Sequence, residues 1–502
     1  MSFQTKTLHH QTIRARNQRR RTLQEKDRCM AAMCGSVPQL FESVLIITLE
    51  PVSSTSGDSD RKPMITYRFP EDEDAEEVPP ELFFPDYSRA QRRKYCNEEF
   101  VMALTDVKGA RKNAYCLKFL NSRDDHKKGS YPGVLVVISP IRNDIFYLDL
   151  ARNIHKYLER GTIRLTCFLE AIFNHSYPQV KGASLVVVEK CSDVTGRPDL
   201  IEIFNQGTIL GRNGLAKIVE RISPEITTCI IASLLGEQRI LLADHTVCAV
   251  SKLVQSMEAL IQPFCWPHVF IPAVPDNLID LCHNPTPYLM GILRNNLVPI
   301  RDLITATADT ENIEQMDFVF IDADTGLIYP PPEPYVCNTN IVVWKQQCAV
   351  RFCKRLGMPK KVSMALITGL RAALVDGTGA SADLRIENMM LIWYASLFGH
   401  YKNITCQCDW GGQQFKQRLV ENQSDKVIRP YLSYLTETVM FHEWIMKRSE
   451  STFAEPTDPL PGTEDYLNRQ IDKLYSAGVN CFTTKRLAKL FTKVTAVLRV
   501  KK

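Results

Sequence analysis

The chain has 502 residues, of which 45% are hydrophobic and 23% are charged. This is an ordinary globular composition, and it excludes whole-chain disorder and fibrous repeats. With 61 basic and 56 acidic side chains, the net charge of +5 is too close to balance for a protein dedicated to nucleic acid, so we expect no nucleic acid partner. At about 150 residues per domain, the length predicts roughly three structural units.

Residues 1–36 form a basic, polar segment without the apolar stretch of a secretory signal. No apolar stretch elsewhere reaches the length of a membrane-spanning helix, so we expect a cytoplasmic protein whose 16 cysteines are reduced. The segment is either a solvated, disordered arm or a basic arm for an anionic partner, such as a membrane contacted through Arg14 to Arg28. Charge runs are usually solvated, which favours the first alternative.

Several strands are predicted in the part of the chain that follows. SVLIITLE, around Val44, and ITYRFP have strand composition. Residues 100–105 and 115–120 are two further strand candidates, and turn residues such as Gly109 join them into a long hairpin. The polar residues 121–130 then form the first boundary between domains. We therefore predict an N-terminal lobe over residues 37–125.

From Pro132 onward, short continuous apolar runs alternate with helical periodicity. Such runs are typical of strands buried on both faces of a sheet. The predicted strands are GVLVVIS (133–139), SLVVVE (184–189), RILLAD (239–244), HVFIP (268–272) and FVFIDAD (318–324). Helices are predicted at 144–158, at 162–173, after Pro224 and at 247–261. This alternation predicts an α/β domain with a substantially parallel sheet over residues 131–330.

A stiff connector with four prolines within residues 330–334 ends this domain. Beyond it the strand signal disappears, and helical periodicity predicts an α-helical module over residues 338–450. Its predicted helices cover residues 341–356, 361–375, 382–398 and 427–448. Residues 451–502 form a C-terminal tail with two further amphipathic stretches, at 466–475 and 484–500.

No motif supports covalent, acid–base or metal chemistry. The glycines and lysine of residues 207–217 are similar to a phosphate-binding loop, but the hydroxyl residue that would bind magnesium is missing. Cys406 and Cys408 have no second ligand pair at zinc spacing, and His245 and His268 lie in contexts typical of structural histidines. We therefore predict no catalytic residue, no metal and no cofactor.

The stretch from Arg239 to Gly291 is dense in prolines that alternate with aromatic side chains. Proline at this density predicts rigid loops at strand ends, where α/β folds place binding surfaces. This stretch resembles the DENN domain family, whose pattern combines E-x-R-I, P-F-x-W-x-H and P-T-P segments. The matching residues, to which we assign structural roles, are Glu237, Arg239, Pro263, Phe264, Trp266, His268, Ile271, Pro272, Pro275, Pro285, Thr286, Pro287 and Gly291.

The resemblance covers about residues 40–450 and implies a bilobal α/β fold. In this family a longin-like N-terminal lobe is joined to a Rossmann-like α/β lobe, which the helical module extends. The resemblance also implies guanine nucleotide exchange on a Rab-family small GTPase in membrane trafficking, with peripheral recruitment to trafficking membranes. Such a factor binds the switch regions and stabilises the nucleotide-free GTPase without covalent chemistry. The alternative is a non-catalytic DENN-fold scaffold or effector that binds a small GTPase or a membrane complex.

Five polar residues are expected to contact the GTPase. Asp322 and Asp324 stand at a predicted strand end, and His283, Asn284 and Tyr288 belong to a rigid loop. The alternative is that all five serve turns and helix caps within the fold.

Overall fold

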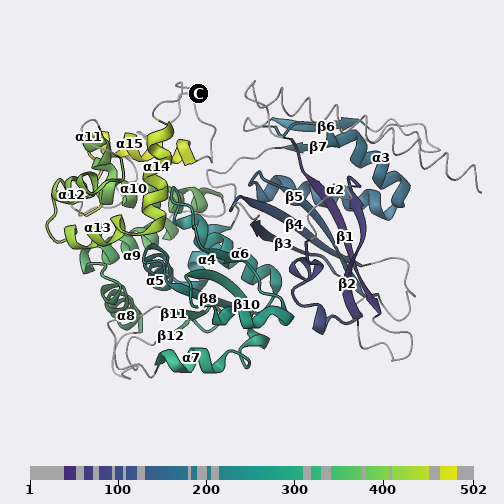
Figure 1. Ribbon diagram of the computed structural model, residues 1–502, viewed down its shortest axis with the longest axis horizontal. Coiled ribbons are helices and arrows are strands. Elements are labelled where there is room, and N and C mark those ends of the chain that lie inside the picture. Colours follow the sequence, from purple (N-terminus) through teal and green to yellow (C-terminus); the bar gives the residue numbers. More distant parts are fainter. Residues whose placement is uncertain are drawn as a thin grey trace, which may run out of the picture.

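The computed structural model describes residues 39–51, 61–71, 78–92, 96–105, 109–120, 130–178, 183–188, 200–204, 214–308, 318–329, 341–375, 380–405, 410–451 and 464–482. The predicted basic arm, the amphipathic stretch at 484–500 and the proline connector lie outside these ranges. Within them, no helix is long and apolar enough to cross a membrane. The chain forms two lobes that lie side by side, each built on a five-stranded sheet (Figure 1).

The first sheet is antiparallel throughout and has the order β2-β1-β5-β4-β3. Its strands are β1 (Ser43–Pro51), β2 (Arg61–Phe69), β3 (Glu98–Thr105), β4 (Arg111–Leu120) and β5 (Pro132–Ser139). The predicted hairpin is confirmed, because β3 pairs with β4 along its whole length. Strand β3 is therefore an edge strand of this sheet, with one side available for contacts outside it.

Strand β5 corrects one prediction about the parallel sheet. We expected this strand to open the parallel sheet, but it pairs antiparallel with β1 and β4. All eight of its residues are buried, because one apolar cluster covers each face of the sheet. A continuous apolar run signals burial on both faces, and it does not specify the direction of the neighbouring strands. The first sheet thus extends past the expected boundary near residue 130.

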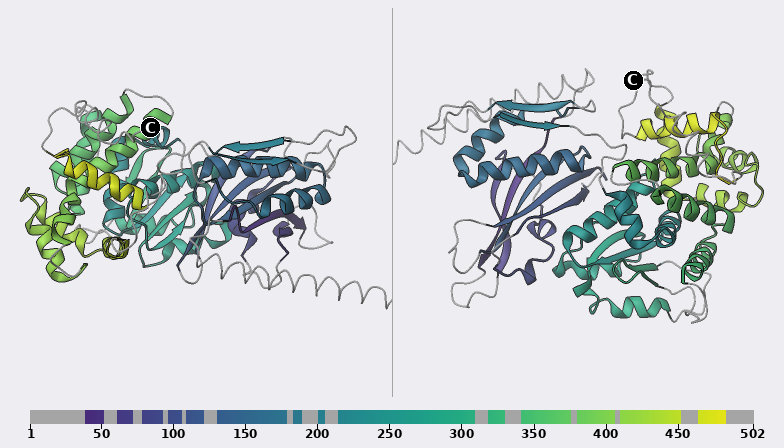
Figure 2. Two further views of the ribbon diagram at one scale, coloured as in Figure 1. Left: turned by 90° about the horizontal axis from the view of Figure 1, so that it is seen from above. Right: turned by 180° about the vertical axis from the view of Figure 1, so that it is seen from behind.

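Two helices, α2 (Asp144–Glu159) and α3 (Thr162–Phe173), cover one face of the first sheet and share an apolar core with it. Strand β6 (Ser184–Val188) was also expected in the parallel sheet, and this prediction is wrong. It forms a separate antiparallel hairpin with β7 (Leu200–Phe204), which lies beside α2 and α3 (Figure 2). We call the described residues from 39 to 204 the N-terminal lobe.

The second sheet has the order β12-β11-β8-β10-β9 and is parallel except for β12. Its strands are β8 (Arg239–Asp244), β9 (Val269–Ile271), β10 (Tyr288–Leu293), β11 (Phe318–Asp322) and β12 (Leu327–Tyr329). The predicted parallel character is confirmed for β8, β9 and β11. Strand β10 lies between β8 and β9, although the sequence was not expected to form a strand there.

Helices cover both faces of the second sheet. Helices α4 (Leu215–Ile222), α5 (Pro224–Leu235) and α6 (Val247–Leu260) share a core with one face. The helical turns of η3 (Asp276–His283) and the start of α7 (Arg301–Ala308) pack on the other. The chain therefore goes from β8 to one face and from β10 to the opposite face.

The C-terminal part is helical as predicted and packs on the second sheet through the core that contains α5 and α6. Its helices are α8 (Ile341–Arg355), α9 (Lys360–Val375), α10 (Ala380–Phe398), α11 (Lys402–Thr405), α12 (Gln413–Glu421), α13 (Arg429–Thr436), α14 (Val439–Ser451) and α15 (Glu464–Ser476). The helix predicted at 427–448 is two helices, because the Thr438 hydroxyl accepts from the Phe441 amide and starts α14 anew. Sheet and helices together form the C-terminal lobe.

Candidate functional site

The two edges of the parallel sheet differ in their surroundings. The amino edge is where strands β8, β9 and β10 begin, and it lies against the helical part of the chain. The carboxyl edge is where these strands end, and it carries exposed charged side chains. The residues with predicted functions are distributed over both edges.

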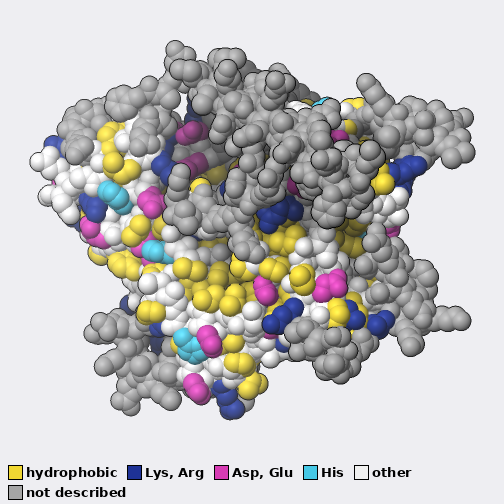
Figure 3. Space-filling view, turned by 45° about the vertical axis from the view of Figure 1, so that its right-hand side comes forward, with side chains coloured by type: hydrophobic (Ala, Val, Ile, Leu, Met, Phe, Trp, Pro, Cys, Tyr) yellow, Lys and Arg dark blue, Asp and Glu magenta, His cyan; other side chains and the backbone are white. Residues whose placement is uncertain are grey.

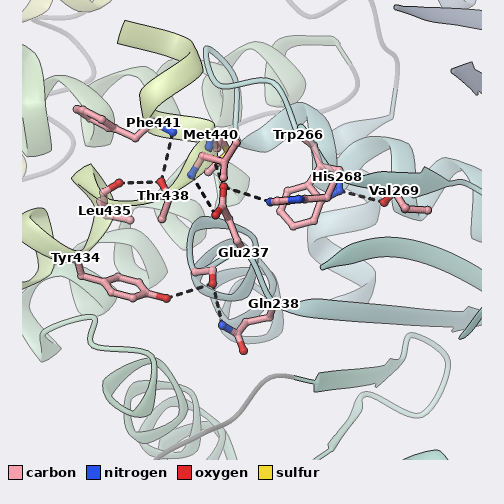
Figure 4. Close-up of polar contacts among 12 residues, drawn as sticks. Glu237, Gln238, Trp266, His268, Val269, Tyr434, Leu435, Thr438, Met440 and Phe441 are labelled. Atoms are coloured by element: carbon pink, nitrogen blue, oxygen red, sulfur yellow. Dashed lines mark hydrogen bonds and ion pairs between the residues drawn. The ribbon is translucent and has the colours of Figure 1, made fainter. Parts of the chain in front are cut away.

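Glu237 joins the amino edge to helix α14. Its carboxylate accepts hydrogen bonds from the Met440 amide at 2.7 Å and from the Val439 amide at 3.2 Å, the first N–H groups of that helix. The same carboxylate lies 3.3 Å from His268 Nε2 (Figure 4). Burial alone would raise the pKa of Glu237, but the hydrogen bonds from His268, Met440 and Val439 lower it below its usual value. Glu237 is therefore ionised and acts as a helix cap supplied by another element.

The aromatic motif residues fill the same joint. Trp266 is buried and its indole N–H donates to the Val269 carbonyl at 3.1 Å, which closes the turn before β9. Phe264 packs against aromatic side chains of the helical part, with ring centroids 5.3 Å from Trp444 and 5.6 Å from Tyr394. The Phe264 side chain thus joins the helices to the sheet, and neither Phe264 nor Trp266 is exposed to a partner.

The other motif residues also make contacts inside the fold. A side chain at Gly291 would place Cβ 2.3 Å from the Pro272 carbonyl oxygen, so only glycine fits there. The Arg239 guanidinium lies 5.5 Å from the ring centroid of Phe318. Thr286 donates to Asn284 through both its amide and its hydroxyl. The motif prolines lie in the loops that enter and leave β9 and β10: Pro263, Pro272, Pro275, Pro285 and Pro287.

A charged cluster occupies the carboxyl edge. It consists of Arg221, Asp244, His245, Arg294, Asp322 and Asp324, and we call it the carboxyl-edge cluster. Arg294 pairs with Asp322 at 2.9 Å and with Asp324 at 2.8 Å. His245 Nε2 lies 3.0 Å from Asp324, and Arg221 pairs with Asp244. Residues from β8, β10 and β11 meet here because parallel strands end at the same edge.

The cluster has a buried layer and an exposed layer. The side chains of Asp244 and Asp322 are 1% and 5% exposed, whereas those of His245, Asp324 and Arg221 are 40% to 56% exposed. Asp322 also accepts from the Asp324 amide at 3.1 Å, which fixes the turn that presents Asp324. The inner acids therefore order the edge, and the outer three side chains are available to a partner.

The position of this cluster in the topology favours binding. Helix α6 leaves β8 toward one face of the sheet, and α7 leaves β10 toward the other. In open α/β sheets, ligands bind outside the carboxyl ends of the strands at such a reversal. His245 and Arg294 follow the ends of these two strands. From the sequence we expected His245 to be structural, and we predicted no role for Arg294 or Arg221. His245 and Arg294 directly follow apolar strands, whereas Arg221 lies near the end of helix α4.

The five predicted contact residues do not form one group. Asp322 and Asp324 lie together in the carboxyl-edge cluster. His283, Asn284 and Tyr288 precede or begin β10 and therefore lie at the opposite edge. Tyr288 is fully buried and its hydroxyl donates to the Cys282 carbonyl at 2.7 Å, so it holds the loop and has no surface to offer. His283 is exposed, and Asn284 is half-buried and bonded to Thr286.

The two lobes touch through the edge strand β3 and helix α6, a region that we call the α6 contact. The Ser251 hydroxyl donates to the Val101 carbonyl at 2.6 Å and lies 3.3 Å from the Val101 amide, and Gln255 donates to the same carbonyl at 3.2 Å. Side chains of α6 thus satisfy the open backbone groups of β3, which would otherwise be free to pair with another strand.

Buried charges reinforce the α6 contact. Glu258 lies 2.7 Å from Arg142 and 3.7 Å from Arg111, which also donates to the His268 carbonyl at 3.1 Å. Burial lowers the pKa of Arg111, and Glu258 opposes this effect. Burial raises the pKa of Asp144 to about 6 despite the nearby Arg142. The lobes therefore share a charged interface beside a carboxyl group whose pKa is raised by burial.

A second attachment, the Asp276 contact, lies just past the carboxyl end of β9. Its N-terminal part is the turn η2 (Tyr87–Arg89). The Asp276 amide donates to the Pro85 carbonyl at 2.9 Å, and its carboxylate accepts from Ser88, from Arg89 at 2.6 Å and from Asn296 at 2.8 Å. The carboxyl edge thus continues onto the N-terminal lobe.

One face of the molecule has the features of an interaction site. Hydrophobic side chains gather in a band across the middle of one face, with acidic and basic side chains beside it (Figure 3). Such bands rimmed by polar groups mark protein interaction sites. In the part of the chain that the structure describes, no group of three His, Cys, Asp or Glu side chains is placed to hold a metal ion.

Comparisons with known proteins show which proteins this chain is similar to. Residues 132–325 match the DENN (AEX-3) domain model, so the match begins at β5 and includes parts of both lobes. The chain is 23% identical over 443 residues to human DENN domain-containing protein 2A, covering 82% of this chain and 40% of that protein. It is 23% identical over 432 residues to human DENN domain-containing protein 2B, covering 82% and 35%. It is 24% identical over 265 residues to mouse DENN domain-containing protein 1B, covering 50% and 32%. The matched part of the chain therefore spans two fifths or less of the length of each of these relatives.

Proposed function

We propose, from the match of residues 132–325 to the DENN (AEX-3) domain model, that the chain is a guanine nucleotide exchange factor for a Rab-family small GTPase. The observation that carries the proposal is the carboxyl edge of the parallel sheet. It is exposed, it bears charges of both signs, and through the Asp276 contact it continues onto the N-terminal lobe. A single partner can therefore touch both lobes at once.

The proposed mechanism needs no reacting group on this chain. The protein binds the nucleotide-free GTPase more tightly than the nucleotide-bound form. By reciprocity, this preference weakens the affinity of the GTPase for its nucleotide. Contacts that draw the switch regions away from the phosphates and their magnesium ion create that preference. The guanine nucleotide and the magnesium ion belong to the GTPase.

Within this proposal, the cluster contains residues that contact the GTPase and residues that position them. The exposed side chains of Asp324, His245 and Arg221 contact the GTPase directly. Buried Asp322 holds the turn that positions Asp324, and Arg294 links the two carboxylates. His283 and Asn284 are proposed as a second, smaller contact at the other edge. Tyr288 is left out of this set because it is fully buried.

The same premise supports finer proposals about fold and location. We infer that the antiparallel sheet lobe is longin-like and that the parallel sheet lobe is Rossmann-like, since the strand direction and helix placement suit those folds. The protein is proposed to be cytoplasmic and to be recruited peripherally to trafficking membranes. Arg14 to Arg28 would contribute to this recruitment by attraction to anionic lipids.

A nucleotide-release screen tests the proposal. Rab-family GTPases loaded with a fluorescent GDP analogue are mixed with the purified chain, and nucleotide release is followed with excess GTP present. We expect faster release from one or a few members of the panel. If no member of a full panel responds, exchange activity is excluded. Binding that prefers the GTP-loaded form over the nucleotide-free form would instead support the non-catalytic scaffold or effector.

A further inference from the structure

The Asp276 contact depends on one exposed hydroxyl group. Ser88 is exposed on turn η2 of the N-terminal lobe, and its hydroxyl donates to the Asp276 carboxylate of the C-terminal lobe. We propose that Ser88 is a phosphorylation site and that its phosphorylation releases the Asp276 contact between the lobes. This inference concerns regulation and goes beyond the proposed exchange activity.

The surroundings of Ser88 suit a protein kinase with an acidic substrate groove. Ser88 lies in a three-residue turn on the surface, and Arg89 and Arg92 follow it in the chain. Charge complementarity of this kind sets the choice of substrate by kinases. In the reaction, Ser88 Oγ forms a bond to the γ-phosphorus of ATP, the bond to the β-phosphate oxygen breaks, and ADP leaves. The hydroxyl proton passes to a base of the kinase.

Phosphorylation would reverse the sign of the interaction at this position. The neutral donor of Ser88 would become a group of about −1.5 to −2 charge that can no longer donate to Asp276. Phosphate and carboxylate would then repel each other. Arg89, which now pairs with Asp276 at 2.6 Å, is adjacent in the chain and offers the phosphate a competing partner. The contact would lose a hydrogen bond, gain a repulsion and lose an ion pair.

The other charges near Ser88 are already engaged and would not absorb the phosphate. Lys118 is buried and holds both oxygens of Asp86, at 2.7 and 2.9 Å, and also Glu98 at 3.2 Å. The Arg92 guanidinium lies 5.0 Å from the centre of the Tyr131 ring. Since Lys118 also anchors the loop to the first sheet, we expect phosphorylation to displace η2 from Asp276 without detaching it from its own lobe.

The α6 contact would survive this change. Ser251 and Gln255 still bind the Val101 backbone, and Arg142 still pairs with Glu258. The lobes would therefore stay joined at one attachment and gain freedom at the other. Phosphorylation of Ser88 would in this way turn a fixed arrangement of the lobes into a hinged one.

The structural consequence is tested with the full chain carrying phosphoserine at position 88, introduced by genetic code expansion. Hydrogen exchange is compared with the unmodified chain. We expect the Asp276 amide, now bonded to Pro85, to exchange at least about tenfold faster, because like charges in contact cost several kilocalories per mole. Peptides across β3 and α6 should not change. Phosphoserine at the exposed Ser433 of α13 is the matched control and should leave Asp276 unaffected.

A second variant separates repulsion from simple disruption of the turn. Asp276→Asn removes the charge that the phosphate would oppose. In that background, phosphoserine at position 88 should change the exchange of η2 peptides less than about twofold. Equal acceleration in both backgrounds would contradict the electrostatic release. Unchanged exchange at Asp276 in the otherwise native chain would overturn the release altogether.

Modification itself is tested by incubating the purified chain with a eukaryotic cell extract and ATP, followed by phosphopeptide mass spectrometry. We expect phosphate on the peptide that contains Ser88, and Ser88→Ala is the control that removes the signal. Phosphate on other serines but not on Ser88 would overturn the assignment. A further measurement, the effect of phosphoserine on GDP release, depends on the proposed function. If the chain shows no exchange activity, the hydrogen-exchange and mass-spectrometry results still decide the inference.

Discussion

The two edges of the parallel sheet are built from the same strands, but their side chains make different kinds of contact. At the amino edge, Glu237, Phe264 and Trp266 are directed into the fold, and their contacts join the sheet to the helices. At the carboxyl edge, Asp324 and His245 are directed to solvent and contact mainly each other and Arg294. The family motif is concentrated at the first edge, so the residues that carry the family resemblance are not those that we propose as partner contacts.

The largest expected effect is at the amino edge. Phe264→Ala removes a side chain that is 2% exposed and surrounded by aromatic rings. We expect the free energy of unfolding to fall by about 3–5 kcal/mol, as measured by chemical denaturation. Under the proposed function, GTPase binding by the fraction that remains folded should be unchanged. A loss below about 1 kcal/mol would show that the helices are joined to the sheet mainly by other contacts.

Gly291→Ala tests packing inside strand β10, and we expect a smaller loss of stability than for Phe264→Ala. The added Cβ would meet the Pro272 carbonyl oxygen and Val250, and neither can move without shifting the backbone or α6. We expect a loss of about 1–3 kcal/mol in the free energy of unfolding. Gly291 does not have a positive φ, so the loss measures packing space and not backbone strain. A loss below about 0.5 kcal/mol would mean that packing space at Gly291 does not matter.

Glu237→Gln tests the helix cap and its dependence on pH. We expect a loss of about 1–3 kcal/mol at pH 7, since hydrogen bonds to a charged group are lost. The pKa of Glu237 is lowered in the folded state, so its ionisation stabilises the fold above the unfolded pKa of 4.5. That contribution disappears as the pH falls through the lowered folded value. The variant and the native chain should therefore converge in stability toward low pH, which thermal unfolding at several pH values measures.

The smallest effect on stability is expected at the carboxyl edge. Asp324→Ala and His245→Ala remove exposed side chains, so the free energy of unfolding should change by less than about 0.5 kcal/mol. Under the proposed function, the same variants should weaken GTPase binding at least about tenfold, as measured by interferometry. Glu437→Ala breaks another exposed ion pair, with Lys416, and should leave binding intact. Normal binding by both edge variants would remove this edge from the proposed site.

Much of the architecture was predictable because burial leaves a clear pattern. Periodicity identified most strands and helices, and the motif prolines were correctly expected in loops at strand ends. Strand β10 was missed because its apolar run, Tyr288–Leu293, directly follows the P-T-P segment. We therefore assigned the run to the same loop. The break between α13 and α14 was missed because part of the cap of α14 comes from Glu237, some 200 positions away, and only the other part comes from the local Thr438 hydroxyl.

The site was less predictable than the fold. Asp322 and Asp324 were identified because polar residues at the end of an apolar strand are conspicuous. Arg221 and Arg294 come from separate elements, and only the closing of the sheet brings them to the same edge. His283 and Asn284 looked equivalent to the aspartates, but they stand at the start of β10 and not at the end of a strand. Whether a residue stands at the start or at the end of a strand decides the edge of the sheet at which it lies. His283 and Asn284 could not be assigned to an edge because β10 was not predicted.

The sequence by itself determined most of the strands and helices and the resemblance to the DENN family. These properties depend on local periodicity and on side-chain chemistry, which short contiguous segments of the chain already contain. Only the tertiary structure decided that β5 belongs to the antiparallel sheet and that Ser88 meets Asp276 across the lobes. Both facts depend on pairing between distant segments, and an apolar run or an exposed serine is compatible with many partners until the chain has folded.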